Sequence, residues 1–327
     1  MGDGWVTWRL ATERALYGEG GFYRRTPGPA AHFRTSVHAS PLFAEALLTL
    51  AASAGLRTVV DIGSGRGELL VQLHRLDPAL RLIGVDVVGR PDDLPAGVEW
   101  LPAVPDVDGA LLVANEWLDN VPVEVVTLCA DGPRLVVVDM ETGAEAEGGP
   151  PSERDAAWLA RWWPLGADGD RAEIGWPRDD AWARVLDRLG SGIAVAIDYA
   201  HGVADRPPAG TLTGYRDGRQ VPPVPDGSCD ITAHVALDAC AEAGRRAGAT
   251  ATVLTTQRAA LAALGLVAER PHSELATSDP GRYVGALARA GELAELRELG
   301  GLGDFGWLIQ SFETPLPAAL GGEQREL

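Results

Sequence analysis

A glycine-rich segment that follows a short apolar run is the clearest chemical signal in the chain. Residues 58–62 are mostly β-branched or aliphatic, and Gly63, Gly65 and Gly67 follow at once. Glycine has no Cβ atom, so a backbone of this composition can turn tightly and approach a ligand closely. Residues 68–76 then have the apolar spacing of a helix. The segment therefore predicts a strand, a ligand-binding turn and a helix.

The spacing of these glycines separates two classes of cofactor. A dinucleotide fingerprint reads GxGxxG, whereas the third glycine comes one residue early here, and Glu68 stands where the fingerprint wants Gly or Ala. Asp61 places a carboxylate at the end of the first strand, where it could hold a cationic amino-acid group. Asp86 ends the next predicted strand, in the position where an acidic residue binds ribose hydroxyls. With Ser64 between the first two glycines, the pattern is typical of S-adenosylmethionine-dependent methyltransferases. A plain tight turn, with Asp86 as a helix cap, is the alternative.

A second group of acidic residues follows two later predicted strands. Glu116 and Asp119 come after the strand at 110–114, and Asp198 ends the strand at 193–197. Open α/β sheets bind ligands at the carboxyl ends of their strands, and paired carboxylates could orient a cationic nucleophile through bidentate hydrogen bonds. Methyl transfer depends mainly on aligning the nucleophile with the methyl donor. We therefore predict these three carboxylates as catalytic residues. Helix capping is the alternative for the first two.

Two histidines are candidates for taking up a proton. His234 is the stronger one, and we predict it as a catalytic residue because histidine is the commonest general base. A structural role is the alternative for His234 and for His201. The six histidines and three cysteines show no HxxxH or CxxC spacing. The sequence therefore predicts neither a metal site nor a disulfide framework.

The elements that must position these residues alternate between strands and helices, which indicates an α/β fold with a mostly parallel sheet. Two runs flanking Asp131-Gly-Pro133 predict a hairpin. Residues 201–228 hold many Gly and Pro residues with little periodicity, and a loop of that length favours a substrate-covering role. Tyr215, Arg216 and Asp230 could form a network there, with an ordinary salt bridge as the alternative. The strands of the sheet are predicted at 58–62, 81–86, 98–100, 110–114, 193–197, 250–254 and 303–309.

Length and charge narrow the classes of function. The 327 residues suggest about two domains, or one large domain with an insertion. A formal charge of -18 repels the phosphates of nucleic acids and of anionic membranes, and it favours a cationic partner. There is no apolar run long enough to span a membrane and no signal-peptide pattern. We therefore expect a cytoplasmic protein that binds neither nucleic acid nor membrane.

Four further motifs stand out along the chain. They are Gly21-Phe-Tyr23 with Phe33-Arg-Thr35-Ser36, Ala114-Asn115-Glu116-Trp117-Leu118-Asp119, Asp198-Tyr199-Ala200, and Asp230-Ile-Thr232-Ala-His234-Val. With these motifs the chain resembles, over nearly its whole length, the MidA-like family of class I S-adenosylmethionine-dependent methyltransferases, relatives of the mitochondrial complex I assembly arginine methyltransferase. His32, Val37 and His38 depart from the family pattern, which raises the question of a changed substrate.

The resemblance implies a Rossmann-like methyltransferase core with helical insertions and an N-terminal cover. We expect the cover in residues 1–45 and the core in 46–140 and 190–327. A substrate-covering insertion is expected at about 201–250, and a loop with a small helical insertion at 141–189. The implied cofactor is S-adenosyl-L-methionine. The predicted cofactor-binding residues are Asp61, Gly63, Ser64, Gly65, Gly67 and Asp86, to which the resemblance adds Thr35, Ser36 and Asn115.

Three hypotheses remain for the reaction. The first is methylation of a nitrogen of a protein partner, with an arginine guanidinium favoured. The second is methylation of a small molecule or a short peptide. The third is a catalytically silent assembly or binding protein on the same fold, and the complete set of turn residues argues against it. The sequence leaves open the acceptor, the methylated atom, the general base and the oligomeric state, for which a homodimer is one possibility.

Overall fold

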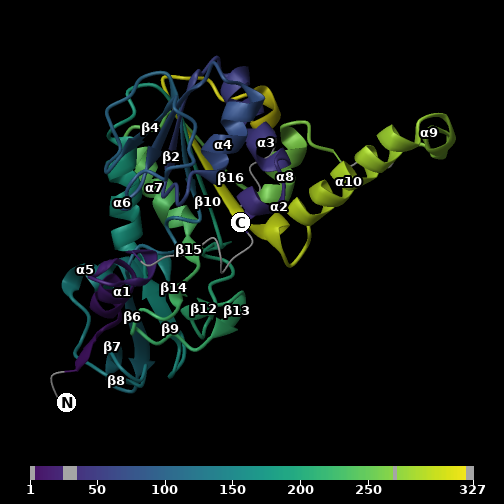
Figure 1. Cartoon of the computed structure of the whole chain (residues 1–327). Coiled ribbons are helices and arrows are strands. Elements are labelled where there is room, and N and C mark those ends of the chain that lie inside the picture. The colour runs from purple at the N-terminus through teal and green to yellow at the C-terminus, as the bar shows by residue number, and fades with distance from the viewer. Residues whose placement is uncertain (1–3, 25–34, 268–270, 322–327) are drawn as a thin grey trace.

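A central seven-stranded sheet forms the middle layer of the computed structural model, which describes residues 4–24, 35–267 and 271–321 (Figure 1). His32 and Phe33 lie outside these residues. The strand order is β4-β3-β2-β5-β10-β17-β16. The first five strands are parallel, and β17 runs antiparallel to both of its neighbours. The predicted α/β class is confirmed. The strands are β2 (Thr58–Ile62), β3 (Arg81–Val85), β4 (Val98–Leu101), β5 (Ala110–Asn115), β10 (Gly192–Asp198), β16 (Ala251–Thr256) and β17 (Gly306–Phe312).

Helices cover both faces of this sheet and create two apolar cores. Side chains alternate along a strand, so Val59 packs in one core and its neighbour Val60 packs in the other. Because both faces are covered, the central strands are almost continuously apolar. One face carries α3 (Leu42–Ser53), α4 (Glu68–Leu76), α8 (Gln257–Ala263) and the end of α10 (Pro280–Leu296), and the other carries α6 (Trp176–Leu186) and α7 (Leu237–Arg246).

A second, antiparallel sheet lies beside the core and differs from the expected segment boundaries. The predicted hairpin at Asp131 is confirmed as β6 and β7, but both strands belong to this second sheet, so the core segment does not run to residue 140. The segment 141–189 adds two strands here and also supplies α6 to the core. The sheet contains β1 (Trp5–Thr7), β6 (Glu124–Cys129), β7 (Gly132–Asp139), β8 (Glu145–Glu147) and β9 (Arg171–Ile174), with helices α1 (Trp8–Tyr17) and α5 (Glu153–Trp162).

The expected cover at 1–45 is likewise divided between the two sheets. Strand β1 pairs with β7 of the second sheet, and α1 packs against the same sheet. The short helix α2 (Ser36–Ala39) and the start of α3 pack on the central core. A three-residue strand that pairs with a partner about 130 residues away leaves no local pattern in the sequence, which is why the division was not predicted.

An insertion of residues 202–234 connects β11 (Ala200–His201) to β15 (Val235–Ala236), and these two short strands pair with each other. The expected insertion ran to about 250, but α7 already belongs to the core. Within the insertion, β12 (Thr213–Arg216), β13 (Arg219–Val221) and β14 (Asp230–Thr232) form a small antiparallel sheet. The sheet therefore holds Tyr215 directly opposite Asp230.

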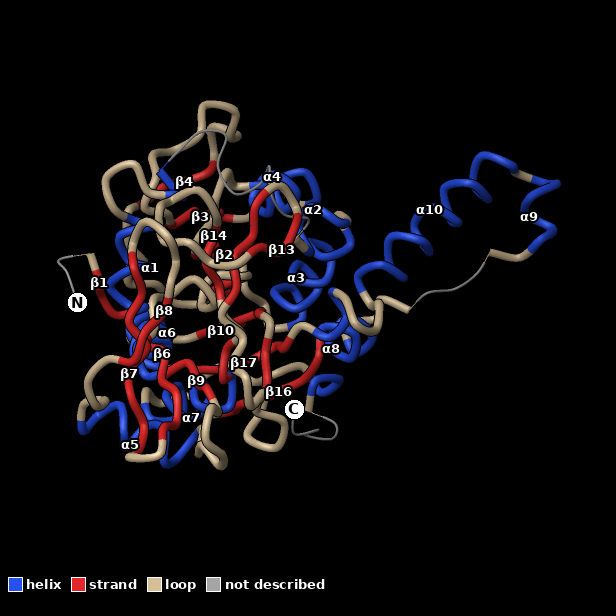
Figure 2. Tube along the Cα trace, turned by 90° about the horizontal axis from the view of Figure 1, so that it is seen from below, coloured by secondary structure: helices blue, strands red, loops and turns tan. Residues whose placement is uncertain are grey.

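Helices α9 (Ser273–Ser278) and α10 project from the body as an arm, as both views show (Figures 1 and 2). In α10 only Leu293 and Leu296 are buried, and these two residues anchor the arm to the core. Among the described residues, no helix combines the length and apolar composition needed to cross a membrane. The short 3-10 turns are η1 (Phe22–Arg24), η3 (Leu302–Asp304) and η4 (Ala318–Leu320).

Candidate active site

A cavity of about 960 Å³ lies at the carboxyl ends of β2, β3 and β5. Its walls come from three parts of the chain. The core supplies the floor, the N-terminal segment supplies Tyr17, Tyr23 and Thr35, and the insertion supplies Tyr215 and Asp230. The volume is near the upper end of the range for ligand pockets, which is roughly 300–1,000 Å³. The cavity can therefore hold a large ligand, at the sheet edge where the sequence predicts one.

The glycine turn forms one wall of this cavity. Gly63, Gly65 and Gly67 have φ values of +70°, +57° and +78°, a conformation that other residues rarely adopt. A Cβ atom on Gly63 would lie 2.7 Å from the Trp117 ring, and one on Gly67 would lie 2.5 Å from the Leu94 side chain. A Cβ atom on Gly65 would meet no atom closer than 3.8 Å. Neighbouring side chains thus leave no room for a Cβ atom on Gly63 or Gly67, whereas a Cβ atom on Gly65 would meet no protein atom at close range.

Two carboxyl groups stand at the turn. Asp86 accepts hydrogen bonds from the backbone amides of Gly65 (2.8 Å) and Val88 (3.0 Å), which fixes its carboxylate at the cavity wall. Asp61 is buried, and this burial raises the pKa of its carboxyl to about 8. Ser64 donates to the Asp61 carbonyl oxygen at 2.7 Å. An arriving ammonium group would stabilise the charged form of Asp61, so these residues fit the amino-acid and ribose parts of S-adenosylmethionine.

Glu116 borders the same cavity in a strained backbone conformation. Its φ of +50° is uncommon for a residue other than glycine. Its carboxylate accepts from the Asn115 side-chain amide at 3.2 Å and from the Ser36 backbone amide. Ser36 directs its hydroxyl elsewhere, to Gln257 at 3.1 Å. Burial, together with the nearby charge of Asp119, raises the pKa of Glu116 to about 8. Glu116 can therefore hold or release a proton near neutral pH.

Asp119 has one carboxylate oxygen that has no hydrogen-bond partner among the described residues. Its Oδ2 atom accepts from the Thr232 hydroxyl at 2.7 Å, while its buried Oδ1 atom has no hydrogen-bond partner. Hydrogen bonds with two other buried residues fix the backbone around Asp119. The Asp198 carboxylate accepts from the amides of Leu118 (3.0 Å) and Asp119 (3.3 Å), and Arg178 donates to the Asp119 carbonyl at 2.6 Å. Asp119, a residue of the cavity lining, is thus held in place while one of its carboxylate oxygens has no hydrogen-bond partner among the described residues.

His234 lies outside the cavity lining, and part of the residue is exposed to solvent. Its ring stacks on Tyr199, a lining residue, with the centroids 5.5 Å apart, and its backbone amide donates to the Thr211 hydroxyl. Burial and the nearby charge of Arg178 lower the pKa of the imidazole. A catalytic role for His234 stays a prediction, because the structure brings only its neighbour Tyr199 to the cavity.

The structure thus divides the predicted site residues into two groups. Four of them lie outside the cavity lining, namely Ser36, Gly67, Asp198 and His234. The others line it, namely Thr35, Asp61, Gly63, Ser64, Gly65, Asp86, Asn115, Glu116 and Asp119. Among the described residues, no group of three or more His, Cys, Asp or Glu side chains could hold a metal ion.

Sequence reasoning missed the contribution of the N-terminal tyrosines. The Tyr23 hydroxyl donates to Asp230 at 2.8 Å, and the rings of Tyr17 and Tyr23 stack 5.5 Å apart. Asn120 also donates to Asp230, at 3.2 Å. Asp230 and Thr232 are two residues apart on β14, and in a strand this spacing predicts that both side chains lie on the same face.

The strand order, the position of the cavity and the glycine turn together define a class I S-adenosylmethionine-dependent methyltransferase. The model of a family described as S-adenosyl-L-methionine-dependent methyltransferases matches residues 70–255. The chain belongs to this family, which confirms the predicted MidA-like relationship and the cofactor S-adenosylmethionine.

Two crystal structures agree with this assignment. The first is a Burkholderia thailandensis protein bound to S-adenosyl-homocysteine. It is 28% identical to this chain with a TM-score of 0.82, and the match covers 98% of this chain and 92% of the other. The second is a native structure from the same organism, 27% identical with a TM-score of 0.81, and its match covers 98% and 91% of the two chains. The comparison with curated proteins found no match.

Proposed function

We propose that this methyltransferase modifies a nitrogen of a cationic acceptor, and that the acceptor is the guanidinium group of an arginine in a protein partner. The observation that carries the proposal is the unpartnered Oδ1 atom of Asp119 beside the cavity. Leaving a buried acceptor atom without a donor costs about 1–3 kcal/mol. A ligand that brings hydrogen-bond donors to this atom would recover that free energy.

The surrounding side chains support a planar cation in preference to a neutral acceptor. Glu116 and Asp230 also line the cavity, and burial raises the pKa of Asp230 to about 7. A guanidinium group carries five N–H donors in one plane, so it can bind carboxylates in pairs and stack on aromatic rings. Tyr17 and Tyr23 provide such rings at the same end of the cavity.

S-adenosylmethionine supplies an electrophilic methyl group on a sulfonium. The acceptor nitrogen forms a bond to the methyl carbon while the carbon–sulfur bond breaks, and the sulfur keeps that electron pair as a thioether. The nitrogen must then lose a proton. Glu116 is suited to hold this proton, because the pKa of its carboxyl is about 8. The residues of the chain thus orient the nitrogen and receive the proton.

The proposal is tested with an arginine-containing peptide and a matched peptide in which lysine replaces the arginine. We expect methylation of the arginine peptide only. Asp119→Asn should raise the KM for this peptide at least about tenfold and leave the affinity for S-adenosylmethionine unchanged. Asp106→Asn is the control, because Asp106 forms only an exposed ion pair with Arg188. Preferential methylation of the lysine peptide, or an unchanged KM in Asp119→Asn, would contradict the guanidinium assignment.

A further inference from the structure

Two buried arginines hold the two ends of the insertion (residues 202–234), and neither of them lines the cavity. Arg206 stands near the start of the insertion, and its side chain is 6% exposed. Arg178 comes from α6, is 2% exposed, and reaches the end of the insertion at His234. Burying a guanidinium is costly unless it is fully hydrogen-bonded. Both residues therefore need an explanation.

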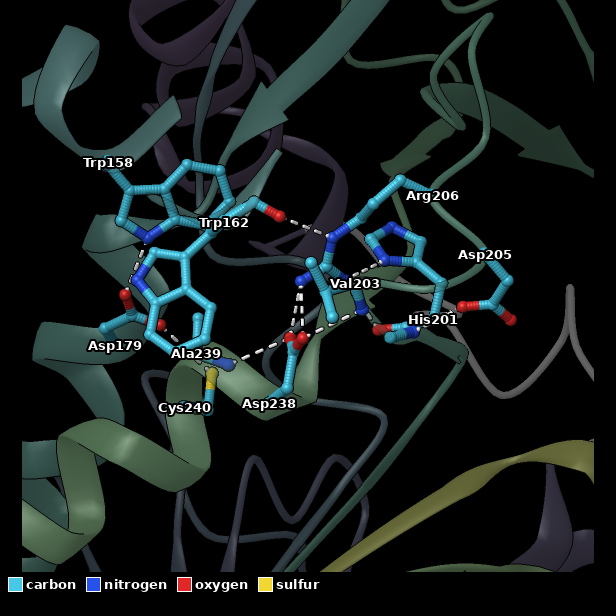
Figure 3. Close-up of polar contacts among 11 residues, drawn as sticks. Trp158, Trp162, Asp179, His201, Val203, Asp205, Arg206, Asp238, Ala239 and Cys240 are labelled. Carbon is cyan, nitrogen blue, oxygen red and sulfur yellow. Dashed lines mark hydrogen bonds and ion pairs between the residues drawn. The ribbon is translucent and has the colours of Figure 1, made fainter. Parts of the chain in front are cut away.

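The Arg206 guanidinium uses all of its nitrogen atoms, as Figure 3 shows. Its Nη2 atom donates to the two carboxylate oxygens of Asp238 at 2.5 and 2.7 Å. Its Nη1 atom lies 2.7 Å from the His201 carbonyl oxygen and 2.6 Å from His201 Nδ1. Its Nε atom donates to the Trp162 carbonyl at 2.8 Å. One side chain thus joins the end of α5, strand β11 and the start of α7.

This arrangement fixes the state of His201. An arginine only donates hydrogen bonds, so Nδ1 of His201 is the acceptor and the proton of the neutral ring is on Nε2. Burial, together with the Arg206 charge, lowers the pKa of His201 to about 3. Since its one free lone pair is bound to Arg206, His201 cannot serve as the proton acceptor that the sequence suggested, and the alternative of a structural role fits it. Its role is to hold the arginine.

The carboxylate of Asp238, which pairs with Arg206, is also held by hydrogen bonds from backbone amides. Asp238 lies in the first turn of α7, where a negative charge is stabilised by the helix dipole. It accepts from its neighbour Ala239 at 2.9 Å and from the amide of Val203 at 3.0 Å. Val203 is the second residue of the insertion. The Arg206–Asp238 pair therefore fastens the outgoing end of the insertion to a core helix.

Arg178 fixes the second end of the insertion, at His234, and connects it to Asp119 of the active site. Its Nη1 atom donates to the His234 carbonyl at 2.7 Å, and its Nη2 atom donates to the Asp119 carbonyl at 2.6 Å. Between the two arginines, the Val235 amide donates to the Tyr199 carbonyl at 2.7 Å. The second end of the insertion is thus fixed to Asp119 and Tyr199, which line the cavity, whereas the first end is fixed to helix α7.

The fixed insertion presents three side chains to the cavity, namely Tyr215, Asp230 and Thr232. Thr232 also hydrogen-bonds Asp119 directly. Because this wall is already ordered before the acceptor binds, the free energy of binding contains no entropic cost of ordering it.

We propose that Arg206 and Arg178 are positioning residues that hold the insertion as a preformed wall for the methyl acceptor. Acceptor affinity then depends on two arginines outside the cavity, while cofactor binding at the glycine turn does not. The identity of the acceptor rests on the proposed function above. The rigidity of the insertion does not depend on that proposal.

The test uses Arg206→Lys and Asp238→Asn in the full chain, together with the double variant. Arg161→Lys is the matched control, because Arg161 forms an exposed ion pair with Glu242 of the same helix α7. We expect faster hydrogen–deuterium exchange of amides in residues 207–233 in both single variants and wild-type exchange in the control. The affinity for S-adenosylmethionine should stay within about twofold, while the KM for the arginine peptide rises about tenfold with a smaller change in kcat.

The double variant checks that the two residues act together. Because the two side chains share one ion pair, its effect should be smaller than the sum of the two single effects. Unchanged exchange in the insertion of both single variants would overturn the proposal, as would a loss of cofactor affinity as large as the loss of acceptor affinity. If the wild-type protein fails to methylate the peptide, the guanidinium assignment fails, and the exchange and cofactor data still decide whether the arginines hold the insertion. If Arg206→Lys fails to fold, Asp238→Asn decides the same question.

Discussion

Gly65 lines the cavity, and a Cβ atom there would meet no protein atom closer than 3.8 Å, so we expect the absence of a side chain to matter for ligand binding more than for packing. We expect Gly65→Val to abolish cofactor binding, because a valine side chain would occupy space that the ligand needs. Gly55→Val is the matched control, since Gly55 has a similar φ of +69° and also has free space around its Cβ position, but lies outside the cavity.

Isothermal titration calorimetry with S-adenosylmethionine measures the difference between these two variants. Both substitutions carry the same kind of backbone strain, so comparable losses of stability are expected. Equal cofactor affinity in the two variants would show that Gly65 is only a turn residue. Tight binding of NAD by the wild-type protein would also contradict the interpretation of the glycine spacing.

Glu116 gives a second prediction at the residue scale. Glu116→Gln keeps the shape of the side chain and removes its ability to take up a proton, so the protein should fold normally and bind the cofactor with nearly unchanged affinity. If the carboxylate serves the acceptor, methyl transfer should fall at least about tenfold, roughly 1.4 kcal/mol in the barrier. If cofactor affinity falls instead, the carboxylate binds S-adenosylmethionine. Since β5 is followed by a turn and then by β6, with no helix among the described residues between them, wild-type transfer and affinity would leave Glu116 with only a structural role in this turn.

The pH dependence follows from the same residue. Below its pKa of about 8 the Glu116 carboxyl is protonated and cannot accept a proton, so kcat/KM of the wild-type protein should rise with pH toward 8. The Glu116→Gln variant should lose this rise. A flat wild-type profile between pH 6 and about 8 would exclude Glu116 as the proton acceptor.

At the scale of elements, helix α1 is fixed to the second sheet by Trp8. This side chain is 1% exposed, and its Nε1 atom donates to Glu145 at 2.7 Å. Trp8→Ala should lower the free energy of unfolding by about 3–5 kcal/mol, measured by urea denaturation. Leu10→Ala on the same helix is the control, because Leu10 is 38% exposed and should change stability by less than about 0.5 kcal/mol. Equal effects of the two substitutions would contradict the packing of α1.

The central sheet could be predicted from the sequence, whereas most of the second sheet could not. The central strands are long apolar runs, such as 110–115, so their positions agree with the sequence within a few residues. The second sheet was not predicted beyond one hairpin. Strands β1, β8 and β9 have three or four residues each, and β1 pairs only with distant residues. Pairing of that kind depends on the tertiary fold more than on local pattern.

At the scale of the whole molecule, the candidate site depends on three distant parts of the chain meeting over one sheet edge. The turn residues and Glu116 could be predicted, because strand ends mark that edge directly. Tyr23 stands out in the sequence only as part of a family motif, and nothing local indicates its hydrogen bond to Asp230 or the burial of Arg178. Tyr23 lies on a glycine-rich N-terminal segment, and Arg178 lies within a helix whose charged residue would ordinarily face solvent.

Transfer of a labelled methyl group tests the proposed reaction most directly. The protein is incubated with methyl-labelled S-adenosylmethionine and a cell extract, and protein and small-molecule fractions are separated and analysed by mass spectrometry. We expect label in the protein fraction as methylarginine, lost in Gly65→Val and retained in Gly55→Val. Label confined to small molecules would contradict the protein acceptor, and label in no fraction, or equal label with Gly65→Val, would contradict methyl transfer at this cavity.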